Sequence, residues 1–531
     1  MKTSDLLVAC LEAEGVEHVF GLPGEELEDI LFSLADSPIE FVPVRHEQGA
    51  AFMADVHGRL TGDAGVCLST LGPGATNLMT GVADAHLDKS PVVAITGQGS
   101  RERLHQESHQ LLDVVNTFAP ITKWNTRLDD PAIVHESVRK AFKLAELEKP
   151  GATHLELPED IAAADSADEP IRPRERRVRR AAPDPGAVER AVEVLAGADR
   201  PLVLAGNGAV RTRAAEQLRA FVEGLNAPTV ATYMGKGAVS DADEHSLLTL
   251  DSGTESQAER VIDRADTVLA VGYDIAEHDP ENWNPDGEKR IVHLDFEPAE
   301  VYEHYVPEVE VVCDIAAGLE ALCAADLDPT GDDWYADLRQ ALATDVTRAP
   351  TEDEPLSVRR ALPIVRDVLA DEDVLISDVG SHKMAIARHY PTYEPNTCIV
   401  SNGLASMGIA VPGAVAADLV TDGNVVAATG DGGFLMNAAE LETAGRLGCS
   451  FTVLLFNDDD YGLIREKQSA HRGGAVGTAL GNPDFPAFAE SFGVSGHRVD
   501  SWDDFRETFA AAVASDDLSL VEVPLARVDD R

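Results

Sequence analysis

Lysine is scarce in this chain. The 531 residues include only 10 lysines, and arginine supplies the other 33 of the 43 basic residues, against 93 acidic residues and a formal net charge of −50. This shortage of positive charge argues against nucleic acid as a partner, because phosphate contacts need lysine and arginine. The acidic residues are spread along the chain rather than gathered in a block, which favours a carboxylate-coated surface over an acidic patch or tail. We expect a salt-adapted cytoplasmic protein, since concentrated salt screens the self-repulsion of such a surface.

Close cysteine pairs and long apolar runs are also absent. The six cysteines, at positions 10, 67, 313, 323, 398 and 449, are widely spaced and most lie in apolar runs. We therefore expect core thiols, with neither disulfides nor a cysteine-ligated metal. No run of about 18 apolar residues occurs, which predicts no membrane-spanning helix. The N-terminal segment turns acidic after a short apolar patch, unlike a signal peptide.

The apolar pattern divides the chain into three parts. Residues 1–165, 188–330 and 357–531 alternate strand and helix patterns. Residues 164–187 are charged and proline-rich without periodicity, and 324–356 form another acidic, proline-containing connection. Such alternation predicts an α/β protein with three doubly wound parallel-sheet domains joined by surface linkers. The first and third parts share their layout, which suggests two related ligand-binding domains on either side of a spacer.

The clearest chemical signal lies in the third part. A buried strand, Val425–Thr429, ends in a glycine-rich turn around Asp431, and a second, Phe451–Phe456, ends in Asn457. Parallel strands joined by a helix present both turns at one edge of the sheet, so Asp431 and Asn457 should reach a common point. A carboxylate and an amide oxygen beside a helix N-terminus suit Mg²⁺ that carries a diphosphate. An ordinary βαβ unit with polar turns is the alternative.

Polar and glycine-rich clusters follow the strands of the first part in the same way. Glu47 follows the strand Phe41–Val44, and other clusters follow Gly65–Thr70 and Val92–Thr96. All of them should lie at the carboxyl edge of one parallel sheet. Apolar residues follow Glu47, which makes it a candidate for acid–base chemistry. The alternative is an exposed glutamate at a helix start, which the helix dipole favours.

Longer segments around these residues resemble a known family. Two of them, RHEQGAAFMADVHGRLTG and LGPGATNLMTG, are similar to the pyrimidine-binding domain of thiamine diphosphate (ThDP)-dependent 2-ketoacid decarboxylases and carboligases. Four others, ISDVGSHKM, SNGLASMGIAVPGAVAA, GDGGFLMNAAELETA and FNDDDYGLI, are similar to the diphosphate-binding domain of that family. The resemblance covers nearly the whole chain and points to the acetolactate synthase large-subunit group. It implies a pyrimidine-binding domain at 1–165, a central Rossmann-like domain at 188–330 and a diphosphate- and Mg²⁺-binding domain at 357–531.

The resemblance also implies roles for single residues. Glu47 would hydrogen-bond the pyrimidine ring of ThDP and favour its imino tautomer, and Met407 would hold the cofactor in a bent shape. Mg²⁺ would be bound by Asp431, Asn457 and Asp459, the last through its backbone carbonyl. Further cofactor-binding residues implied are Pro23, Gly24, Thr70, Gly74, Asn77, Gly380, Ser381, His382, Ala405, Gly430, Gly432, Gly433, Tyr461, Gly462 and Leu463.

The substrate pocket implied by the resemblance contains Gln98, His109 and Gln110, with a plain surface position as the alternative for the histidine. The implied reaction decarboxylates pyruvate and joins the product to a second 2-ketoacid, giving 2-acetolactate and CO₂ when that acceptor is pyruvate; 2-ketobutyrate is another possible acceptor. Alternatives are another ThDP-dependent 2-ketoacid decarboxylase or an aldehyde carboligase or lyase. A non-catalytic subunit would lack Glu47 or the Asp431/Asn457 pair, and all three residues are present.

The central part of the sequence indicates whether the protein binds FAD. Gly206-Asn207-Gly208 follows a strand but lacks the third glycine of a dinucleotide fingerprint. Tyr273–Asn284 and Arg290–Val301 resemble the catabolic, FAD-free branch of the family, so we expect ThDP and Mg²⁺ but no FAD. In this family the cofactor touches outer domains of different subunits, so we expect a homodimer at minimum, or a tetramer. The sequence leaves the acceptor and a regulatory small subunit open.

Overall fold

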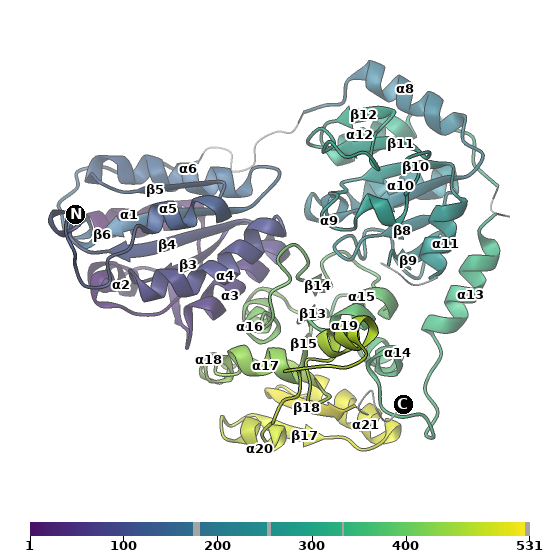
Figure 1. Ribbon diagram of the computed structural model, residues 1–531. Helices are drawn as coiled ribbons and strands as arrows, with labels where there is room; N and C mark the ends of the chain where they lie inside the picture. Colours follow the sequence, from purple (N-terminus) through teal and green to yellow (C-terminus); the bar gives the residue numbers. More distant parts are fainter. Residues whose placement is uncertain (174–180, 252–255, 326, 332–333, 526–531) are drawn as a thin grey trace.

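The computed structural model describes residues 1–173, 181–251, 256–325, 327–331 and 334–525, and it contains three six-stranded sheets (Figure 1). Residues 174–180 of the linker predicted at 164–187 lie outside the described residues, as do 326 and 332–333 of the second linker. Every strand pairing within the three sheets is parallel. The predicted α/β fold class, with three parallel sheets, is confirmed.

The first sheet has the strand order β2-β1-β3-β4-β6-β5. Its central strands β3 and β4 are buried along their whole length, as the continuous apolar runs of a strand covered on both faces predict. The strands are β1 His18–Gly21, β2 Glu40–Pro43, β3 Gly65–Ser69, β4 Val92–Gln98, β5 Trp124–Arg127 and β6 Ala152–Pro158. The helices are α1 Thr3–Glu14, α2 Glu28–Ala35, α3 Glu47–Thr61, α4 Pro73–Leu87, α5 Val114–Phe118, α6 Val134–Glu146 and α7 Glu159–Ala162.

The third sheet repeats this plan. Its order, β14-β13-β15-β16-β18-β17, is the order of the first sheet when the strands of each are numbered along the chain. The expected common layout of the outer parts therefore holds at the level of topology. The strands are β13 Val374–Ser377, β14 Cys398–Val400, β15 Val425–Gly430, β16 Thr452–Asn457, β17 Ser495–Arg498 and β18 Ser519–Pro524. The helices are α14 Val358–Val368, α15 Ser381–His389, α16 Ala410–Val420, α17 Asp431–Asn437, α18 Glu440–Leu447, α19 Gly462–Arg472, α20 Phe485–Glu490 and α21 Trp502–Val513.

The central sheet has the order β12-β11-β10-β7-β8-β9, which is the strand order of a Rossmann fold. Its strands are β7 Pro201–Ala205, β8 Thr229–Ala231, β9 Ser246–Thr249, β10 Thr267–Val271, β11 Arg290–Asp295 and β12 Val309–Val312. Its helices are α8 Pro185–Ala196, α9 Asn207–Arg211, α10 Ala215–Leu225, α11 Gln257–Arg264 and α12 Ile315–Cys323. Short 3₁₀ helices complete the fold: η1 Glu25–Leu27, η2 Arg101–Arg103, η3 Ala119–Ile121, η4 Pro131–Ile133 and η5 Pro280–Asn282.

One predicted linker contains regular structure. The stretch 324–356, expected to be a connection between domains, includes the helix α13, Ala336–Val346. Tyr335, Leu338 and Leu342 recur at intervals of three and four residues and are buried in the core of the central domain. The acidic residues around them hid this short apolar stripe, so the prediction of a bare connection was wrong.

The outer domains share one hydrophobic core. Residues of α3 and α4 from the first domain and of α16 from the third belong to the same buried cluster. The two long helices α3 and α16 approach closely: a Cβ atom on Gly413 of α16 would lie 2.9 Å from Cγ2 of Val56 in α3. The first and third domains are therefore packed directly against each other within one chain.

Two sequence expectations can be compared directly with the described residues. All six cysteines are free thiols, and five of them are buried, as expected; Cys323 is exposed. Among the described helices, none combines the length and the apolar character that a membrane span needs.

Candidate active site

Glu47 is the first residue of α3 and lies just beyond the end of β2, as the strand-end argument predicts. Its side chain is buried, with the residue only 4% exposed, so the alternative of an exposed helix-start glutamate is wrong. The Nδ2 atom of Asn77 donates a 2.9 Å hydrogen bond to Oε2 of Glu47. A Cβ atom on Gly74 would lie 3.2 Å from Oε1, so a side chain there would crowd the carboxylate.

Other predicted residues of the first domain gather around the same turn. A Cβ atom on Gly24, which follows the exposed Pro23, would lie 2.4 Å from Cβ of Thr70. Only glycine therefore permits this approach of two strand-end loops. Gln110 joins them from a later loop: a Cβ atom on Gly72 would lie 2.5 Å from its backbone oxygen. The structure thus brings Pro23, Gly24, Thr70, Gly74, Asn77 and Gln110 to the edge of the sheet where Glu47 lies.

The three predicted substrate residues differ in environment. His109 and Gln110 are exposed on the loop after β4, whereas Gln98, at the end of that strand, is buried. The Nε2 atom of Gln98 donates to the Leu112 carbonyl at 3.1 Å and to Oε1 of Glu156 at 2.9 Å. Its Oε1 accepts a 2.9 Å hydrogen bond from the Gly99 N–H. Gln98 therefore ties the loop to the sheet, and contact of these residues with a substrate stays a prediction.

In the third domain, the side chains of the three residues predicted to bind Mg²⁺ converge. Oδ2 of Asp431, Oδ1 of Asn457 and Oδ1 of Asp459 lie 2.6, 3.1 and 3.0 Å from the single Nδ2 atom of Asn482. The backbone carbonyl of Asp459, predicted as its ligand atom, accepts a 2.8 Å hydrogen bond from the Leu480 N–H. Two carboxylates and an amide oxygen are a donor set that fits Mg²⁺. The described residues contain no cluster of three histidine, cysteine, aspartate or glutamate side chains suited to another metal.

The environment of Asp431 is partly apolar. Burial raises the pKa of its carboxyl to about 6, against the opposing effect of the Asn482 hydrogen bond, and nearby Asp458 raises it further. A bound divalent cation would oppose this shift, because it favours the ionised carboxylate.

The predicted diphosphate residues lie at the start of α15. Gly380 immediately precedes that helix, and Ser381 and His382 form its first turn, where free N–H groups point outward. His382 is buried beside Gly430, and its ring stacks on Phe456 at 6.4 Å between centroids. Burial lowers the pKa of His382 to about 4, so the ring is neutral near pH 7. Its Nε2 atom has no hydrogen-bond partner among the described residues, which suits an anionic ligand placed there.

The remaining predicted loop residues surround this helix start. A Cβ atom on Gly432 would lie 2.7 Å from Cε1 of Tyr461, and one on Gly462 would lie 3.3 Å from Oγ of Ser381. Leu463 follows in the first turn of α19 and is half-buried. Gly433 is packed against Asp378, a residue that the sequence analysis did not predict.

Asp378 is a buried carboxylate that connects two loops of the site. It accepts hydrogen bonds from the Gly408 N–H at 2.8 Å and from Oγ1 of Thr429 at 3.1 Å. Burial raises its pKa, although these hydrogen bonds oppose the shift. The loop that it holds contains Ala405, in the left-handed region at φ +55°, and the half-buried Met407. Asp378 directly follows β13 by one position, so its place at a strand end was the available signal.

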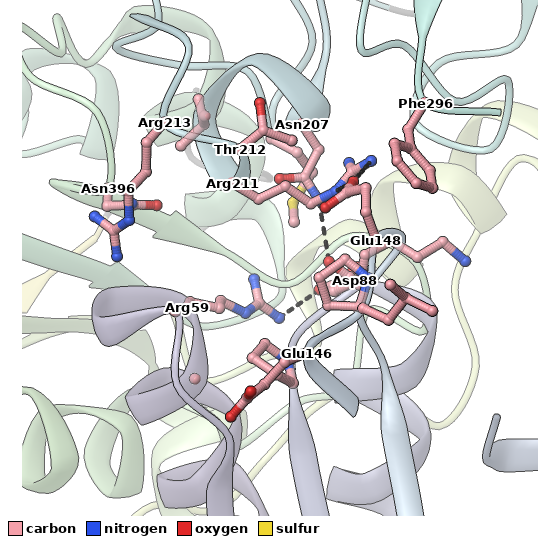
Figure 2. A pocket seen from close by; sticks show the side chains of 18 of the residues that line it. Arg59, Asp88, Glu146, Glu148, Asn207, Arg211, Thr212, Arg213, Phe296 and Asn396 are labelled. Carbon is pink, nitrogen blue, oxygen red and sulfur yellow. Dashed lines mark hydrogen bonds and ion pairs between the residues drawn. The ribbon is translucent and has the colours of Figure 1, made fainter. Parts of the chain in front are cut away.

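A second missed feature is a buried group of charges, here named the Arg59 cluster: Asp55, Arg59, Asp84 and Asp88. Arg59 lies 2.9 Å from Asp55, 2.6 Å from Asp88 and 3.8 Å from Asp84. Burial and the neighbouring Asp88 raise the pKa of Asp84 well above its ordinary value. Asp88 also accepts, through its backbone carbonyl, a 3.0 Å hydrogen bond from Asn207 of the central domain, and Figure 2 shows it between Arg59 and Asn207.

The Arg59 cluster also holds residues 400–408 of the third domain. The contacts are Arg59 Nη1 to the Val400 carbonyl (3.0 Å), Ser401 Oγ and Ser406 N to Asp84 Oδ1 (2.8 and 3.3 Å), and Gly403 N to Asp88 Oδ1 (2.5 Å). Arg59 comes 12 positions after Glu47 in the continuous helix α3. A rise of 1.5 Å per residue separates these positions by about 18 Å. Arg59 and the Val400 carbonyl therefore lie at the opposite end of α3 from Glu47.

A cavity of about 660 Å³ lies beside the Arg59 cluster, between residues of all three domains (Figure 2). Arg59 and Asp88 line it from the first domain, Asn207 from the central domain and Asn396 from the third. Neither Glu47 nor Asp431 is among its lining residues. This cavity is thus separate from the two groups of residues at strand ends described above, here named the strand-end clusters: the one around Glu47 in the first domain and the one around Asp431 in the third.

In a comparison with known protein families, each of the three domains matches a domain of the same class of enzyme. Residues 1–117 match the model of the thiamine pyrophosphate enzyme N-terminal TPP-binding domain, 188–322 that of the central domain, and 378–523 that of the C-terminal TPP-binding domain. Thiamine pyrophosphate is another name for thiamine diphosphate. The fold and the two strand-end clusters therefore define a ThDP-dependent enzyme.

Individual relatives narrow the class. The chain is 33% identical to an acetolactate synthase of Bacillus subtilis, over 99% of this chain and 94% of that protein. It is 34% identical to a catabolic acetolactate synthase of Raoultella terrigena, over 98% of this chain and 94% of that protein. A probable acetolactate synthase large subunit of Methanocaldococcus jannaschii is 32% identical, over 98% and 92%. The chain belongs to the acetolactate synthase family, which confirms the resemblance seen in the sequence.

Proposed function

We propose that this chain is an acetolactate synthase: it decarboxylates pyruvate and joins the product to a second 2-ketoacid, giving 2-acetolactate and CO₂ when the second ketoacid is pyruvate. The observation that carries the proposal is the near full-length similarity to acetolactate synthases together with two intact strand-end clusters. ThDP, when bound, supplies the reactive carbon and the electron sink. The chain supplies binding, orientation and proton transfer.

Each cluster has a task in this proposal. Glu47, held by Asn77 in a buried position, would exchange a proton with the pyrimidine ring of ThDP. Asp431, Asn457 and Asp459 would hold Mg²⁺. The start of α15 and the neutral ring of His382 would donate hydrogen bonds to the diphosphate. Ala405 and Met407 would contact the pyrimidine ring. The other proposed cofactor contacts are those of the sequence analysis, and Gln98, His109 and Gln110 are proposed for the substrate pocket.

A homodimer is part of the proposal. The family resemblance supports it, because the cofactor of such enzymes touches outer domains of different subunits. Both outer domains of this chain match thiamine pyrophosphate-binding models. Exposed apolar side chains near the third-domain cluster support a covered surface: Leu435, Met436 and Ile464 are 40%, 47% and 49% exposed.

The proposal includes no FAD. The predicted FAD-free segment Tyr273–Asn284 contains Glu277, whose carboxylate accepts hydrogen bonds from the Asn207 N–H at 2.9 Å and from Oγ1 of Thr232 at 2.5 Å. Asn207 belongs to the glycine turn after β7, where a Rossmann fold places the anionic part of a dinucleotide. An internal carboxylate thus lies where a pyrophosphate would bind. Purified protein with near-stoichiometric flavin absorbance would overturn this part.

We also propose the domain bounds 1–165, 188–330 and 357–531, with helix α13 added to the central domain, and a salt-adapted protein of the cytoplasm. The six-stranded sheets and the three matched family segments support the domain bounds. The net charge of −50 supports salt adaptation.

Product analysis tests the proposed reaction. Purified protein with ThDP and Mg²⁺ in concentrated KCl is given pyruvate, 2-ketobutyrate or glyoxylate, and products are identified by mass spectrometry. We expect 2-acetolactate and CO₂ from pyruvate, and 2-aceto-2-hydroxybutyrate when 2-ketobutyrate is added. Acetaldehyde as the only product would assign a simple decarboxylase, and products from glyoxylate alone would assign a different carboligase; either result overturns the proposal.

A further inference from the structure

Glu440 is a carboxylate of the third domain that lies buried against the first domain. It is the first residue of α18, and its exposed fraction is 0%. The Arg45 N–H donates to both of its oxygens, at 3.1 and 3.2 Å, and the His46 N–H donates to Oε1 at 3.0 Å. Oγ1 of Thr443 donates to Oε2 at 2.6 Å. The proposed function gives this carboxylate no role, yet Arg45 and His46 directly precede Glu47.

The turn between β2 and α3 is held by this carboxylate. The backbone bonds of the sheet end at Val44, whose N–H donates to a carbonyl of β1 at 2.9 Å. Those of α3 begin at Gly49, whose N–H donates to the His46 carbonyl at 2.9 Å. The Arg45 and His46 N–H groups between them donate to Glu440. Because an ionised acceptor makes strong hydrogen bonds, Glu440 restrains the path of the chain from the sheet to the helix.

The start of α3 is shaped to receive the carboxylate. A Cβ atom on Gly49, in the first turn of α3, would lie 2.7 Å from Oε1 of Glu440, so a side chain there would displace the carboxylate. Glu440 begins α18 and contacts the beginning of α3, and both helix dipoles favour a negative charge at these ends. Burial raises the pKa of Glu440, and its hydrogen bonds oppose this shift. Its partners are N–H and O–H donors, which suits an ionised carboxylate.

Other contacts of α18 hold the same turn. Nη2 of Arg446 donates to the Pro43 carbonyl, and Oε2 of Glu442 lies 4.0 Å from Nη1 of Arg45. The Arg446 and Glu442 side chains are partly exposed. Glu440 is the buried member of this set, and it binds the two N–H groups that precede α3.

We propose that Glu440 is a positioning residue for Glu47: it holds the turn before α3 so that the Glu47 carboxylate meets the pyrimidine ring of ThDP in the geometry that proton exchange needs. This inference rests on the proposed function, because that function assigns the proton exchange to Glu47. Asn77 restrains the Glu47 side chain from within the first domain, whereas Glu440 restrains the preceding backbone from the third domain. A reacting group misplaced by about 1 Å can lose about 100-fold in rate. The position of the acid–base group thus depends on the packing of two domains.

Hydrogen exchange on bound ThDP tests the role of Glu440. Full-length protein with saturating ThDP and Mg²⁺ in concentrated KCl is diluted into deuterium oxide and quenched with acid, and NMR follows the loss of the proton on the reactive carbon. Glu440→Gln keeps the shape but replaces one acceptor oxygen by an NH₂ donor, so it should slow the exchange by about 100-fold. The ThDP dissociation constant should stay nearly unchanged, because Glu440 contacts none of the proposed diphosphate or Mg²⁺ ligands. Glu440→Asp keeps both acceptor oxygens on a shorter arm and should recover part of the rate.

Glu442→Gln is the matched control. It changes the same residue type in the same helix without touching the two N–H groups, so its exchange rate should equal that of the wild type. The second comparison uses Glu47→Gln as the background. If Glu440 acts through Glu47, adding Glu440→Gln to Glu47→Gln should change the rate by no more than about twofold.

Three outcomes would overturn the inference: wild-type exchange in Glu440→Gln, the same loss in Glu442→Gln, or an undiminished loss when Glu440→Gln is added to Glu47→Gln. Circular dichroism shows whether each variant is folded, and Glu440→Asp carries the same comparisons if Glu440→Gln does not fold. A Glu47→Gln protein that exchanges as fast as the wild type would instead contradict the proposed function.

Discussion

The side-chain amide of Asn77 donates a 2.9 Å hydrogen bond to the carboxylate of Glu47, which joins the starts of α3 and α4 at the edge of the first sheet. Glu47→Gln should lower kcat by about 10²- to 10⁴-fold, the usual contribution of a positioned acid–base group. The amide has nearly the same shape, so the thermal unfolding midpoint should stay within a few degrees. Steady-state assays and circular dichroism check both values. The exposed Glu25→Gln variant serves as control, and full activity of Glu47→Gln would refute the assignment.

Asp431→Ala should abolish cofactor-linked stabilisation. For the wild type, ThDP and Mg²⁺ at about 100 times their dissociation constant should stabilise the folded protein by about 2.7 kcal/mol. The variant lacks one of the three converging oxygen ligands, so the added cofactors should leave its unfolding midpoint almost unchanged. Asp371→Ala, an exposed change before β13, should retain the full shift. A normal shift in Asp431→Ala would remove this residue from the cation site.

Arg59→Ala should destabilise the fold strongly. The change leaves Asp55, Asp84 and Asp88 buried without their central cation, and such a loss costs about 3–5 kcal/mol. Urea unfolding in concentrated KCl measures the free energy of unfolding. The comparison is Arg506→Ala, which breaks an exposed ion pair with Asp367 and should change stability by less than about 1 kcal/mol. Equal effects of the two changes would show that burial does not determine the strength of the Arg59 cluster.

His154 should contribute to acid sensitivity. Burial lowers the pKa of its ring from 6.5 to about 3, and the neutral ring stacks on Phe118 and lies 2.8 Å from Oγ1 of Thr96. Below pH 6.5 this histidine binds a proton in the unfolded chain but stays neutral in the folded chain. Its contribution to the free energy of unfolding is therefore fully present above pH 6.5 and is lost progressively between pH 6.5 and about 3. His154→Phe should reduce this slope by up to about 1.4 kcal/mol per pH unit. The free energy of unfolding of the wild type and of His154→Phe is measured by urea unfolding from pH 7 to 4. The same pH dependence in both proteins would contradict the prediction.

Salt should continue to stabilise the protein at KCl concentrations well above about 0.1 M. With a net charge of −50, self-repulsion opposes the compact state at low ionic strength. Activity and the unfolding midpoint should therefore rise together as KCl is increased above about 0.1 M, where the Debye length is already about 10 Å. Choline chloride at equal ionic strength separates general screening from an effect of potassium. Full stability and activity at about 0.1 M salt would contradict salt adaptation.

Much of the candidate site could be predicted because it lies at the ends of parallel strands. Asp431 follows β15 and Asn457 is the last residue of β16. These strands are neighbours in the sheet, so strand topology alone predicts that the two residues approach each other. Glu47 follows β2 by the same rule. The shared strand order of the outer sheets is the structural counterpart of the layout seen in the sequence.

The residues that escaped prediction reach the site by another route. Asn482 arrives through the return of the chain after α19, and no strand-end pattern marks it. The Arg59 cluster depends on α3, α4 and the loop before α16 meeting in space, and a scattered arginine and three aspartates have no periodic signature. The helix α13 has only a short apolar stripe inside an acidic stretch. Tertiary contact, and not local pattern, determines these features.

The division of the proposed site between two outer domains has a consequence for mixtures of defective chains. Glu47 lies in the first domain and Asp431 in the third, and in the proposed dimer each cofactor is held by the first domain of one chain and the third domain of the other. A Glu47→Gln chain and an Asp431→Ala chain, each inactive alone, would then form hybrid dimers in which one centre carries both defects and the other carries none. Two dead preparations, allowed to exchange subunits, should regain activity by complementation, and a chain that used both residues on one cofactor could not.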